Sequence, residues 1–266
     1  MDMYKKGAFI NIVSPEPAEW EADFRRIKNL PSRHHVEIWL EYIPSKEERT
    51  ALQSMLRGTE VIVHGPFIHL SLATHLNALR DISLRKFDEA VEFAAQIGAQ
   101  VVTFHAGTYP MFETQEIALE RLASKFYRFT GLKSPIVTLE NMPVRGEGTT
   151  RECLGHLKDL TLLQLMIPDI HFTLDIGHCL QNGDDYESFL RTQSSRIANI
   201  HLHDGKFGGR AHLRLGAGTL DLPKLVGVLR ETGFTKYISL ETISSEDTTS
   251  SWPAWLNAEQ VHGASD

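Results

Sequence analysis

Short runs of β-branched and other apolar residues alternate eight times with longer stretches of helical periodicity, and this alternation limits the fold more than any other feature. Most of the runs are continuously apolar, which is typical of parallel strands covered on both faces. Eight strand and helix pairs in about 250 residues predict a closed parallel (β/α)8 TIM barrel. The expected strands are residues 8–13, 36–40, 60–64, 100–105, 136–140, 171–175, 197–201 and 237–241.

The helices between these strands have recognisable ends. Ser45 precedes a Glu-rich turn, Asp221 and Pro223 open a later helix, and Gly98 stops a helix expected near residues 83–96. The last helix is expected at 252–260. Because no linker or low-complexity tract divides the chain, we expect one domain over residues 1–266. The alternative, an open doubly wound sheet, usually carries a Gly-rich loop after its first strand, and residues 13–16 offer none.

Composition excludes several classes of protein. With 42% hydrophobic and 23% charged residues, the chain has ample material for a core and is not a disordered protein. Two cysteines, Cys153 and Cys179, rule out a disulfide framework and a four-cysteine zinc site. No run approaches the roughly 18 apolar residues of a membrane span, and no signal peptide is evident, so we expect a cytoplasmic protein without a membrane partner.

The net charge of −7 argues against a polyanion as the main partner, because phosphate binding requires clustered Lys and Arg. Lys206, Arg210 and Arg214 form the one local basic cluster. An acidic protein can still carry a positive pocket, so the charge disfavours nucleic acid without excluding it. A monomer and a homo-oligomer are both compatible with the sequence.

Histidine and carboxylate residues stand at the carboxyl ends of six consecutive expected strands, where a barrel of this kind places its active site. Taken singly, each of them is more often a rim residue or a helix cap than a ligand. Buried carboxylates gathered near one axis, however, repel one another and lose hydration, and a divalent cation resolves that cost. Imidazole and carboxylate ligands without thiolate suit zinc, manganese, cobalt or iron better than calcium or magnesium. The residues are His64, His105, Glu140, Asp175, His201 and Glu241, with His178 three positions after Asp175.

The strand-end motifs VIVHGPF, VVTFHAG, VTLENMP, FTLDIGHC, NIHLHDG and ISLET together resemble the xylose-isomerase-like barrel superfamily. This superfamily includes sugar and sugar phosphate isomerases, ketose 3-epimerases, inosose-processing enzymes and the endonuclease IV type of abasic-site nuclease. The resemblance runs from Val36 to Thr242. It implies one divalent metal, zinc, manganese or cobalt, held by four ligands: Glu140, Asp175, His201 and Glu241.

Two further features of the resemblance separate its branches. His64 and His105 are similar to the histidines that share the residue at Glu140 to hold a second metal in the nuclease branch. That branch also has Asp-Arg-His before a Gly-x-Gly, where this chain has Arg210, Ala211 and His212. Because a guanidinium stays charged and repels cations, we expect no third metal here. Arg210 instead resembles a loop arginine that isomerases and epimerases direct at substrate oxygens.

The favoured function is therefore a metal-dependent isomerase or epimerase of a sugar, a sugar phosphate or a related hydroxy-ketone. The resemblance implies that Glu140 and Glu241 are the acid and base, and that proton removal next to a carbonyl gives an enediolate. The expected substrate contacts come from His178, Arg210, His212, Phe67 and Lys206. By the resemblance, His178 corresponds either to a third-metal ligand of the nuclease branch or to an epimerase histidine that contacts a substrate oxygen. Glu37 either binds substrate or forms a rim ion pair. Trp39 and Tyr109 could add aromatic walls, although core packing is the simpler expectation for Trp39.

Two alternatives use the same residues. A phosphodiesterase acting on abasic DNA would keep His64 and His105 as working ligands of a second metal. A dehydratase of an inosose-like ketone would use one metal and lose water after proton abstraction. A purely structural metal site is disfavoured, because such sites are closed by four ligands without spare acids and bases nearby.

Overall fold

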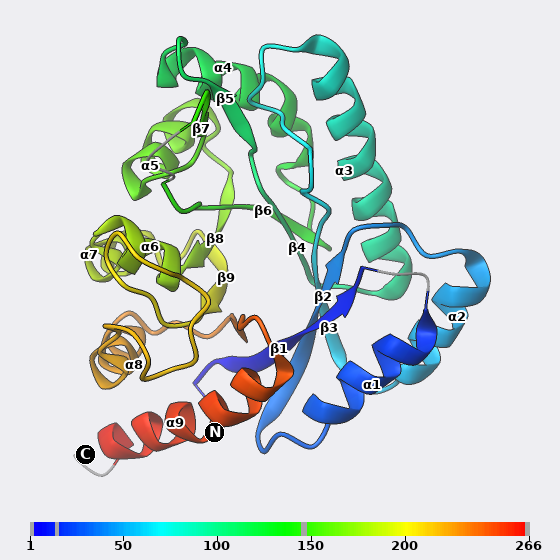
Figure 1. Ribbon diagram of the computed structural model, residues 1–266, viewed down its shortest axis with the longest axis vertical. Helices are drawn as coiled ribbons and strands as arrows, with labels where there is room; N and C mark the ends of the chain where they lie inside the picture. The colour runs from blue at the N-terminus through cyan, green and yellow to red at the C-terminus, as the bar shows by residue number, and fades with distance from the viewer. Residues whose placement is uncertain (1–2, 14–15, 145–147, 264–266) are drawn as a thin grey trace.

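Eight parallel strands close into a barrel in a computed structural model that describes residues 3–13, 16–144 and 148–263 (Figure 1). The order around the barrel is β1-β10-β9-β8-β6-β4-β3-β2. Barrel strands that are consecutive in the sequence therefore lie side by side. The predicted (β/α)8 fold is confirmed. The barrel strands are β1 Lys5–Ile12, β2 Arg33–Leu40, β3 Glu60–His64, β4 Val101–Phe104, β6 Ile136–Glu140, β8 His171–Asp175, β9 Ile197–Leu202 and β10 Tyr237–Leu240.

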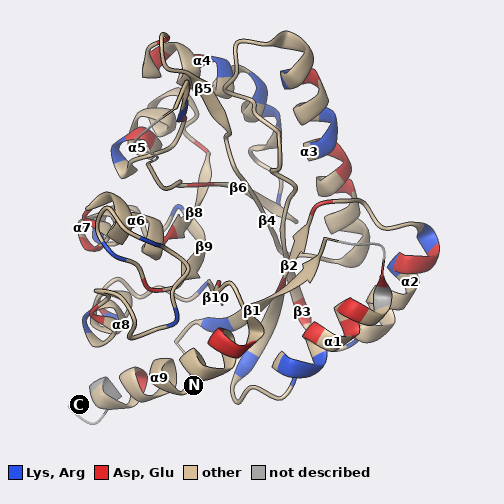
Figure 2. Ribbon diagram, in the orientation of Figure 1, with Lys and Arg blue, Asp and Glu red and all other residues tan. Residues whose placement is uncertain are grey.

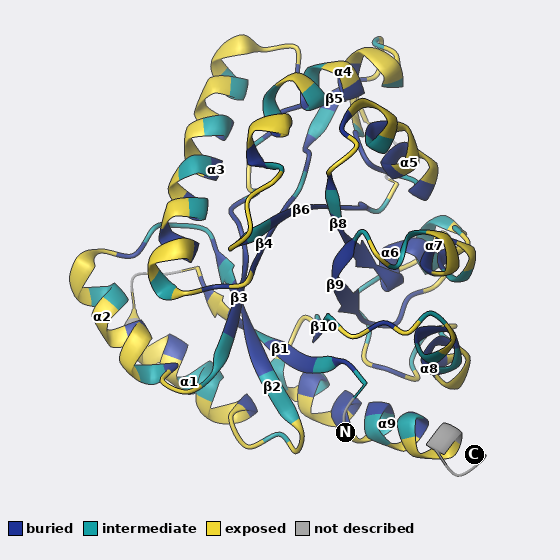
Figure 3. Ribbon diagram, turned by 180° about the vertical axis from the view of Figure 1, so that it is seen from behind, coloured by how far each residue is buried: buried dark blue, intermediate teal, exposed yellow. Residues whose placement is uncertain are grey.

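Helices surround the barrel and carry most of its exposed charge, whereas the strands are almost wholly buried (Figures 2 and 3). None of the helices in the described part of the chain has the length and apolar character that a membrane crossing requires. The helices are α1 Pro17–Ile27, α2 Lys46–Met55, α3 Asn77–Ile97, α4 Gln115–Phe126, α5 Leu157–Met166, α6 Ile176–Asn182, α7 Tyr186–Gln193, α8 Leu222–Glu231 and α9 Ser245–Gly263, with a 3₁₀ turn η1 Tyr127–Phe129 after α4.

Two helices start earlier than their sequence patterns predict. Helix α9 begins at Ser245 rather than at 252, because the Ser244 hydroxyl accepts the Asp247 N–H at 3.1 Å and donates to Asp247 Oδ2 at 3.0 Å. This cap lies more than two turns ahead of Pro253, which therefore falls inside the helix rather than at its start. Helix α3 begins at Asn77 and ends at Gly98 in the left-handed conformation, as that glycine predicts.

A small antiparallel ribbon lies beside the barrel and was not predicted. It pairs β5 (Thr108–Pro110) with β7 (Thr150–Glu152), and both segments lie in loops that follow barrel strands β4 and β6. Each segment has only three residues, which is too short for an alternating pattern to emerge from the sequence.

Hydroxyl groups fill part of the barrel interior below the strand ends. Thr103, Thr138 and Thr173, from β4, β6 and β8, are fully buried, and the Thr173 hydroxyl lies 2.8 Å from that of Thr103 and 2.7 Å from that of Thr138. These bonds satisfy polar groups that would otherwise be costly to bury. The polar interior continues upward to the carboxyl ends of the strands, where the candidate site lies.

Candidate metal centre

Four side chains from separate strands meet at the carboxyl end of the barrel. Glu140 and Asp175 are the last residues of β6 and β8, His201 lies near the end of β9, and Glu241 directly follows β10. One ligand atom from each lies within 4.8 Å of the others. His201 Nδ1 is central, at 2.9 Å from Glu241 Oε2 and 3.2 Å from Glu140 Oε1. The set predicted from sequence is thus brought together in space.

Three buried atoms of this cluster have no hydrogen-bond partner among the described residues: His201 Nδ1, Glu140 Oε2 and Glu241 Oε2. Buried polar atoms without hydrogen-bond partners are rare in native proteins. Two of these atoms face each other between His201 and Glu241, and Glu140 Oε2 faces His64 and His105, so a divalent cation at either position would satisfy them. One imidazole and three carboxylates are a donor set that a divalent transition metal accepts. The residues present therefore fit the metal that the sequence predicted.

Glu37 fixes the orientation of the central histidine. His201 Nε2 lies 3.1 Å from Glu37 Oε1, and the second oxygen of Glu37 accepts a hydrogen bond from Asn199 Nδ2 at 2.9 Å. Because the carboxylate only accepts, Nε2 carries the proton and Nδ1 faces the cluster. A carboxylate behind a ligating histidine is a common means of setting its tautomer.

The charges of the cluster depend on one another. Burial opposes a positive charge on His201, but Glu140, Glu37 and Glu241 raise its pKa well above the ordinary value. Burial likewise opposes a charge on Glu140, yet His201 and His105 hold the pKa of Glu140 well below its usual range. Without a metal, the proton on His201 is therefore the cation that offsets the carboxylates.

Glu140 also faces a second cluster with its other oxygen. His64 Nε2 and His105 Nε2 each lie 3.3 Å from Glu140 Oε2, and the two nitrogens are 3.1 Å apart. His64 Nδ1 lies 2.9 Å from the carbonyl oxygen of Gly65, which can only accept, so the lone pair of the neutral ring is on Nε2, where it could bind a cation beside Glu140. The geometry suits a second cation bridged to the first by Glu140.

A third group contains only histidines. His178, His203 and His212 each offer a ring nitrogen, and these atoms lie within 4.8 Å of one another. His178 Nε2 is 3.3 Å from His212 Nε2, and the rings of His203 and His212 stack with centroids 4.1 Å apart. Burial lowers the pKa of His178. His178 Nδ1, 2.9 Å from the carbonyl oxygen of Asn141, donates to it, so Nε2 faces His212 as an acceptor.

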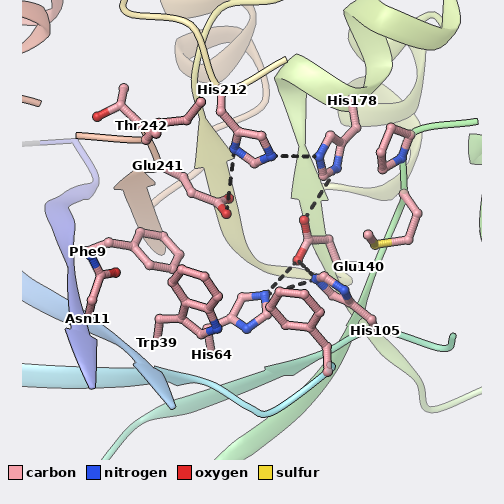
Figure 4. Close-up of a pocket in the computed structure, with 14 residues that line it drawn as sticks. Phe9, Asn11, Trp39, His64, His105, Glu140, His178, His212, Glu241 and Thr242 are labelled. Carbon is pink, nitrogen blue, oxygen red and sulfur yellow. Dashed lines mark hydrogen bonds and ion pairs between the residues drawn. The ribbon is translucent and has the colours of Figure 1, made fainter. Parts of the chain in front are cut away.

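The three groups open into a cavity of about 330 Å³ (Figure 4). This volume is in the range of pockets that enclose a small molecule. Trp39 and Phe67 stack with centroids 5.6 Å apart and form an aromatic wall, and Phe67 also stacks on the His105 ring. The lining residues are Phe9, Asn11, Trp39, His64, Phe67, His105, Glu140, Met142, Pro143, His178, His212, Glu241, Thr242 and Ile243.

The residues expected to contact substrate divide into two groups. Phe67, His178 and His212 line the cavity. Lys206 and Arg210 are exposed in the loop after β9, where the Lys206 N–H bonds to the Arg210 carbonyl oxygen at 3.1 Å, and neither lines the cavity. Arg210 is thus too exposed to repel a metal in the cavity, whereas the aspartate ligand of the nuclease branch is still replaced at this position.

Three other residues lie elsewhere than expected. Glu37 is fully buried in the barrel interior behind His201, so it forms neither a rim ion pair nor part of the cavity lining. Trp39 lines the cavity instead of packing in the core, because it shares the inward face of β2 with Glu37 two positions earlier. Tyr109 is buried in β5 against Gln115 and does not line the cavity.

Sequence reasoning did not single out Asn199, His203 or Asp204. Asn199, His201 and His203 follow a two-residue period, which places all three on the inward face of β9 and its extension. This alternation in the motif NIHLHD was the available signal. Asp204 is fully buried and accepts four backbone N–H bonds of 2.9–3.0 Å, from Gly205, Gly216, Gly218 and Leu220.

The family assignment follows from comparison with known proteins. Residues 34–260 match the family described as xylose isomerase-like TIM barrel. The chain belongs to this family. Its relatives include the uncharacterized protein MJ1311 of Methanocaldococcus jannaschii, 29% identical over 71% of this chain and 66% of that protein. A probable endonuclease 4 of Aquifex aeolicus is 27% identical over 71% of this chain and 73% of its own length.

Solved structures resemble this chain more in fold than in sequence. A crystal structure titled as a D-tagatose 3-epimerase-like protein superposes with a TM-score of 0.80 over 98% of this chain and 99% of that one. Sequence identity is 20%, so this similarity establishes the fold and not the reaction. The chain spans 62–72% of the length of the first uncharacterized relatives that it matches.

Proposed function

We propose that this protein is a divalent-metal-dependent isomerase or epimerase acting on a sugar, a sugar phosphate or a related hydroxy-ketone. The observation that carries the proposal is the placement of Glu140 and Glu241 around His201 Nδ1, each with a buried oxygen that lacks a hydrogen-bond partner. Both carboxylates border one cavity, so both can reach the same bound molecule (Figure 4). A base and an acid in such positions are what proton transfer between carbon atoms requires.

A metal held by Glu140, Asp175, His201 and Glu241 would supply Lewis acidity toward a carbonyl and its neighbouring hydroxyl. Glu241, in reach of the cavity, then takes the proton from the carbon next to the carbonyl, and the C–H electron pair leaves an enediolate. Glu140 takes up a proton from solvent and delivers it to the neighbouring carbon or to the opposite face, which gives isomerisation or epimerisation. Glu241 releases to solvent the proton that it took, so both carboxylates return to their starting states and no further reactant is consumed.

The other lining residues orient the substrate. The Nδ1 proton of His178 is engaged by the Asn141 carbonyl, so its Nε2 carries the lone pair, and a substrate hydroxyl donates to it in place of the contact with His212 Nε2. The wall formed by Trp39 and Phe67 packs on the apolar C–H face of a sugar ring. The name of the epimerase-like structural relative is consistent with this assignment.

Solvent deuterium exchange tests the proposal. Metal-loaded protein would be incubated in D₂O with free and phosphorylated ketopentoses and ketohexoses, and deuterium incorporation would be followed by NMR. We expect exchange at the carbon next to the carbonyl, and we expect Glu241→Gln to abolish it. Glu60→Gln, in which the altered carboxylate pairs with Lys5 at the opposite end of the barrel, is the matched control. Full exchange by Glu241→Gln would remove its role as acid or base.

A second candidate is metal-dependent hydrolysis of a phosphodiester, favoured specifically by the approach of His64 and His105 to Glu140 Oε2. This second cluster has no task in the isomerase scheme, whereas two bridged metals suit attack on a phosphodiester. The relative named probable endonuclease 4 agrees with this candidate. Cleavage of a duplex with one abasic site, lost in His64→Ala, would establish hydrolysis, and absence of cleavage with two metals bound would exclude this substrate.

A further inference from the structure

His203 joins the metal ligand Asp175 to the loop that carries His212. Its side chain is fully buried and does not line the cavity. His203 Nε2 lies 2.9 Å from Asp175 Oδ2, and His203 Nδ1 lies 2.8 Å from the backbone nitrogen of His212. The two nitrogens of one ring thus contact two different parts of the candidate site.

The contact with His212 decides where the His203 proton lies. A backbone N–H can only donate, so Nδ1 must accept from it and cannot itself carry a proton. The Asp204 carbonyl oxygen is also 3.2 Å from Nδ1, but a proton directed at that oxygen would conflict with the shorter contact to the His212 N–H. In the neutral ring the proton is therefore on Nε2, where it is donated to Asp175 Oδ2.

The surroundings of His203 leave room for this ring alone. A Cβ atom on Gly177 would lie 1.8 Å from His203 Nδ1. The position of the His203 ring therefore requires glycine at residue 177. Asp175 is held from its other side as well, because its Oδ1 accepts the His178 N–H at 2.6 Å at the start of α6. His203 thus completes the set of donors that fixes both oxygens of Asp175.

We propose that His203 is a positioning residue, which holds Asp175 through Nε2–H and anchors the backbone of His212 through Nδ1. This inference rests on the proposed use of Asp175 as a metal ligand. In this proposal the group of His178, His203 and His212 does not bind a metal, because Nε2 of His203 is protonated and donates to Asp175. Partners that orient a ligand typically change metal affinity by about 10–100-fold when removed.

Two substitutions separate the two contacts. The side-chain nitrogen of His203→Gln takes the place of Nε2 and still donates to Asp175, but it leaves the His212 N–H without an acceptor. The side-chain oxygen of His203→Asn takes the place of Nδ1 and still accepts from His212, but it does not reach Asp175. His156→Gln, at a histidine 3.0 Å from the carboxylate of Asp184, is the matched control.

The measurements are Zn²⁺ affinity, by competition with a chelator, and amide hydrogen exchange at His212. For His203→Asn we expect about 10–100-fold weaker zinc binding with normal exchange. For His203→Gln we expect near-normal zinc affinity and roughly ten-fold faster exchange at His212. Equal effects of both variants on both measurements would overturn the proposal, as would a third zinc ion in the wild type that either variant removes.

A measurement on the wild-type protein tests the proposal even if the variants fail to fold. In ¹⁵N NMR spectra of the zinc-loaded protein, we expect His203 to be the tautomer with hydrogen on Nε2. A proton on Nδ1, or zinc bound at Nε2, would overturn the proposal. If the wild type binds no zinc, the proposed function fails, whereas the anchoring of His212 is still tested by amide exchange.

Discussion

Glu37 on β2 and His201 on β9 are bonded across the barrel interior, with Glu37 Oε1 3.1 Å from His201 Nε2 and both side chains fully buried. Asn199, also on β9, holds the second oxygen of Glu37. Glu37 therefore affects the metal centre by setting the tautomer of His201, and not by contact with a substrate.

Replacement of Glu37 is expected to weaken metal binding without altering the four ligands. Glu37→Leu leaves His201 free to rotate and to carry its proton on Nδ1, so zinc affinity should fall about 10–100-fold. Glu37→Gln keeps an acceptor for Nε2–H and should retain most of the affinity. Chelator competition measures both, with Glu60→Gln as control. Zinc binding by Glu37→Leu equal to that of the wild type would show that the bond has no role at the centre.

Metal affinity should rise with pH because the metal must displace the proton on His201. Burial disfavours that proton, but the neighbouring carboxylates raise the pKa of His201 well above 6.5, so the metal-free protein holds it at neutral pH. Binding should therefore release about one proton per metal between roughly pH 6 and 8. Calorimetry in buffers of different ionisation enthalpy measures this release. A heat of binding independent of the buffer would contradict it.

The same proton affects the stability of the metal-free protein in the opposite direction. Because the pKa of His201 is raised by folding, the stability it contributes is full below the unfolded value near 6.5 and is lost as pH rises through the folded pKa. We expect the free energy of unfolding without metal to fall as pH increases above neutral, and zinc to remove this trend. Urea unfolding at several pH values, with and without zinc, provides the measurement.

Asp204→Asn should loosen the loop between β9 and α8. Asp204 accepts four backbone N–H bonds, and an amide nitrogen in place of Oδ2 would face the N–H groups of Gly216 and Gly218. Loss of such charge-assisted bonds costs about 1.5–3 kcal/mol each. Asp221→Asn is the control, because Asn caps α8 as well as Asp. Equal denaturation midpoints for the two variants would contradict the role of Asp204.

The ends of the strands could be predicted from the sequence because local patterns determine them. The apolar runs that end at His64, Glu140 and Asp175 end at the same residues in the structure. Once these runs are arranged in a parallel barrel, their last residues must meet at one end. The convergence of the four candidate ligands therefore required no knowledge of the loops.

The remaining parts of the site depend on contacts between distant residues. Arg210 and His212 are two positions apart, yet Arg210 is exposed and His212 lines the cavity. The path of the loop here depends on the bond from the His212 N–H to His203 Nδ1 and on the backbone bridge between Asp204 and Leu213. The fit between Gly177 and His203 likewise joins two motifs and has no signature in either. Glu37 and Trp39 could have been placed better, since their two-residue spacing puts both on the inward face of β2.

The most direct test of the account is to locate the metal. Crystals grown with zinc would be measured at its absorption edge, and we expect an anomalous peak about 2.0–2.2 Å from ligand atoms of Glu140, Asp175, His201 and Glu241. A second peak beside His64 and His105 would add the bridged centre. An empty position between the four residues at saturating zinc, or zinc bound only elsewhere, would contradict the central claim.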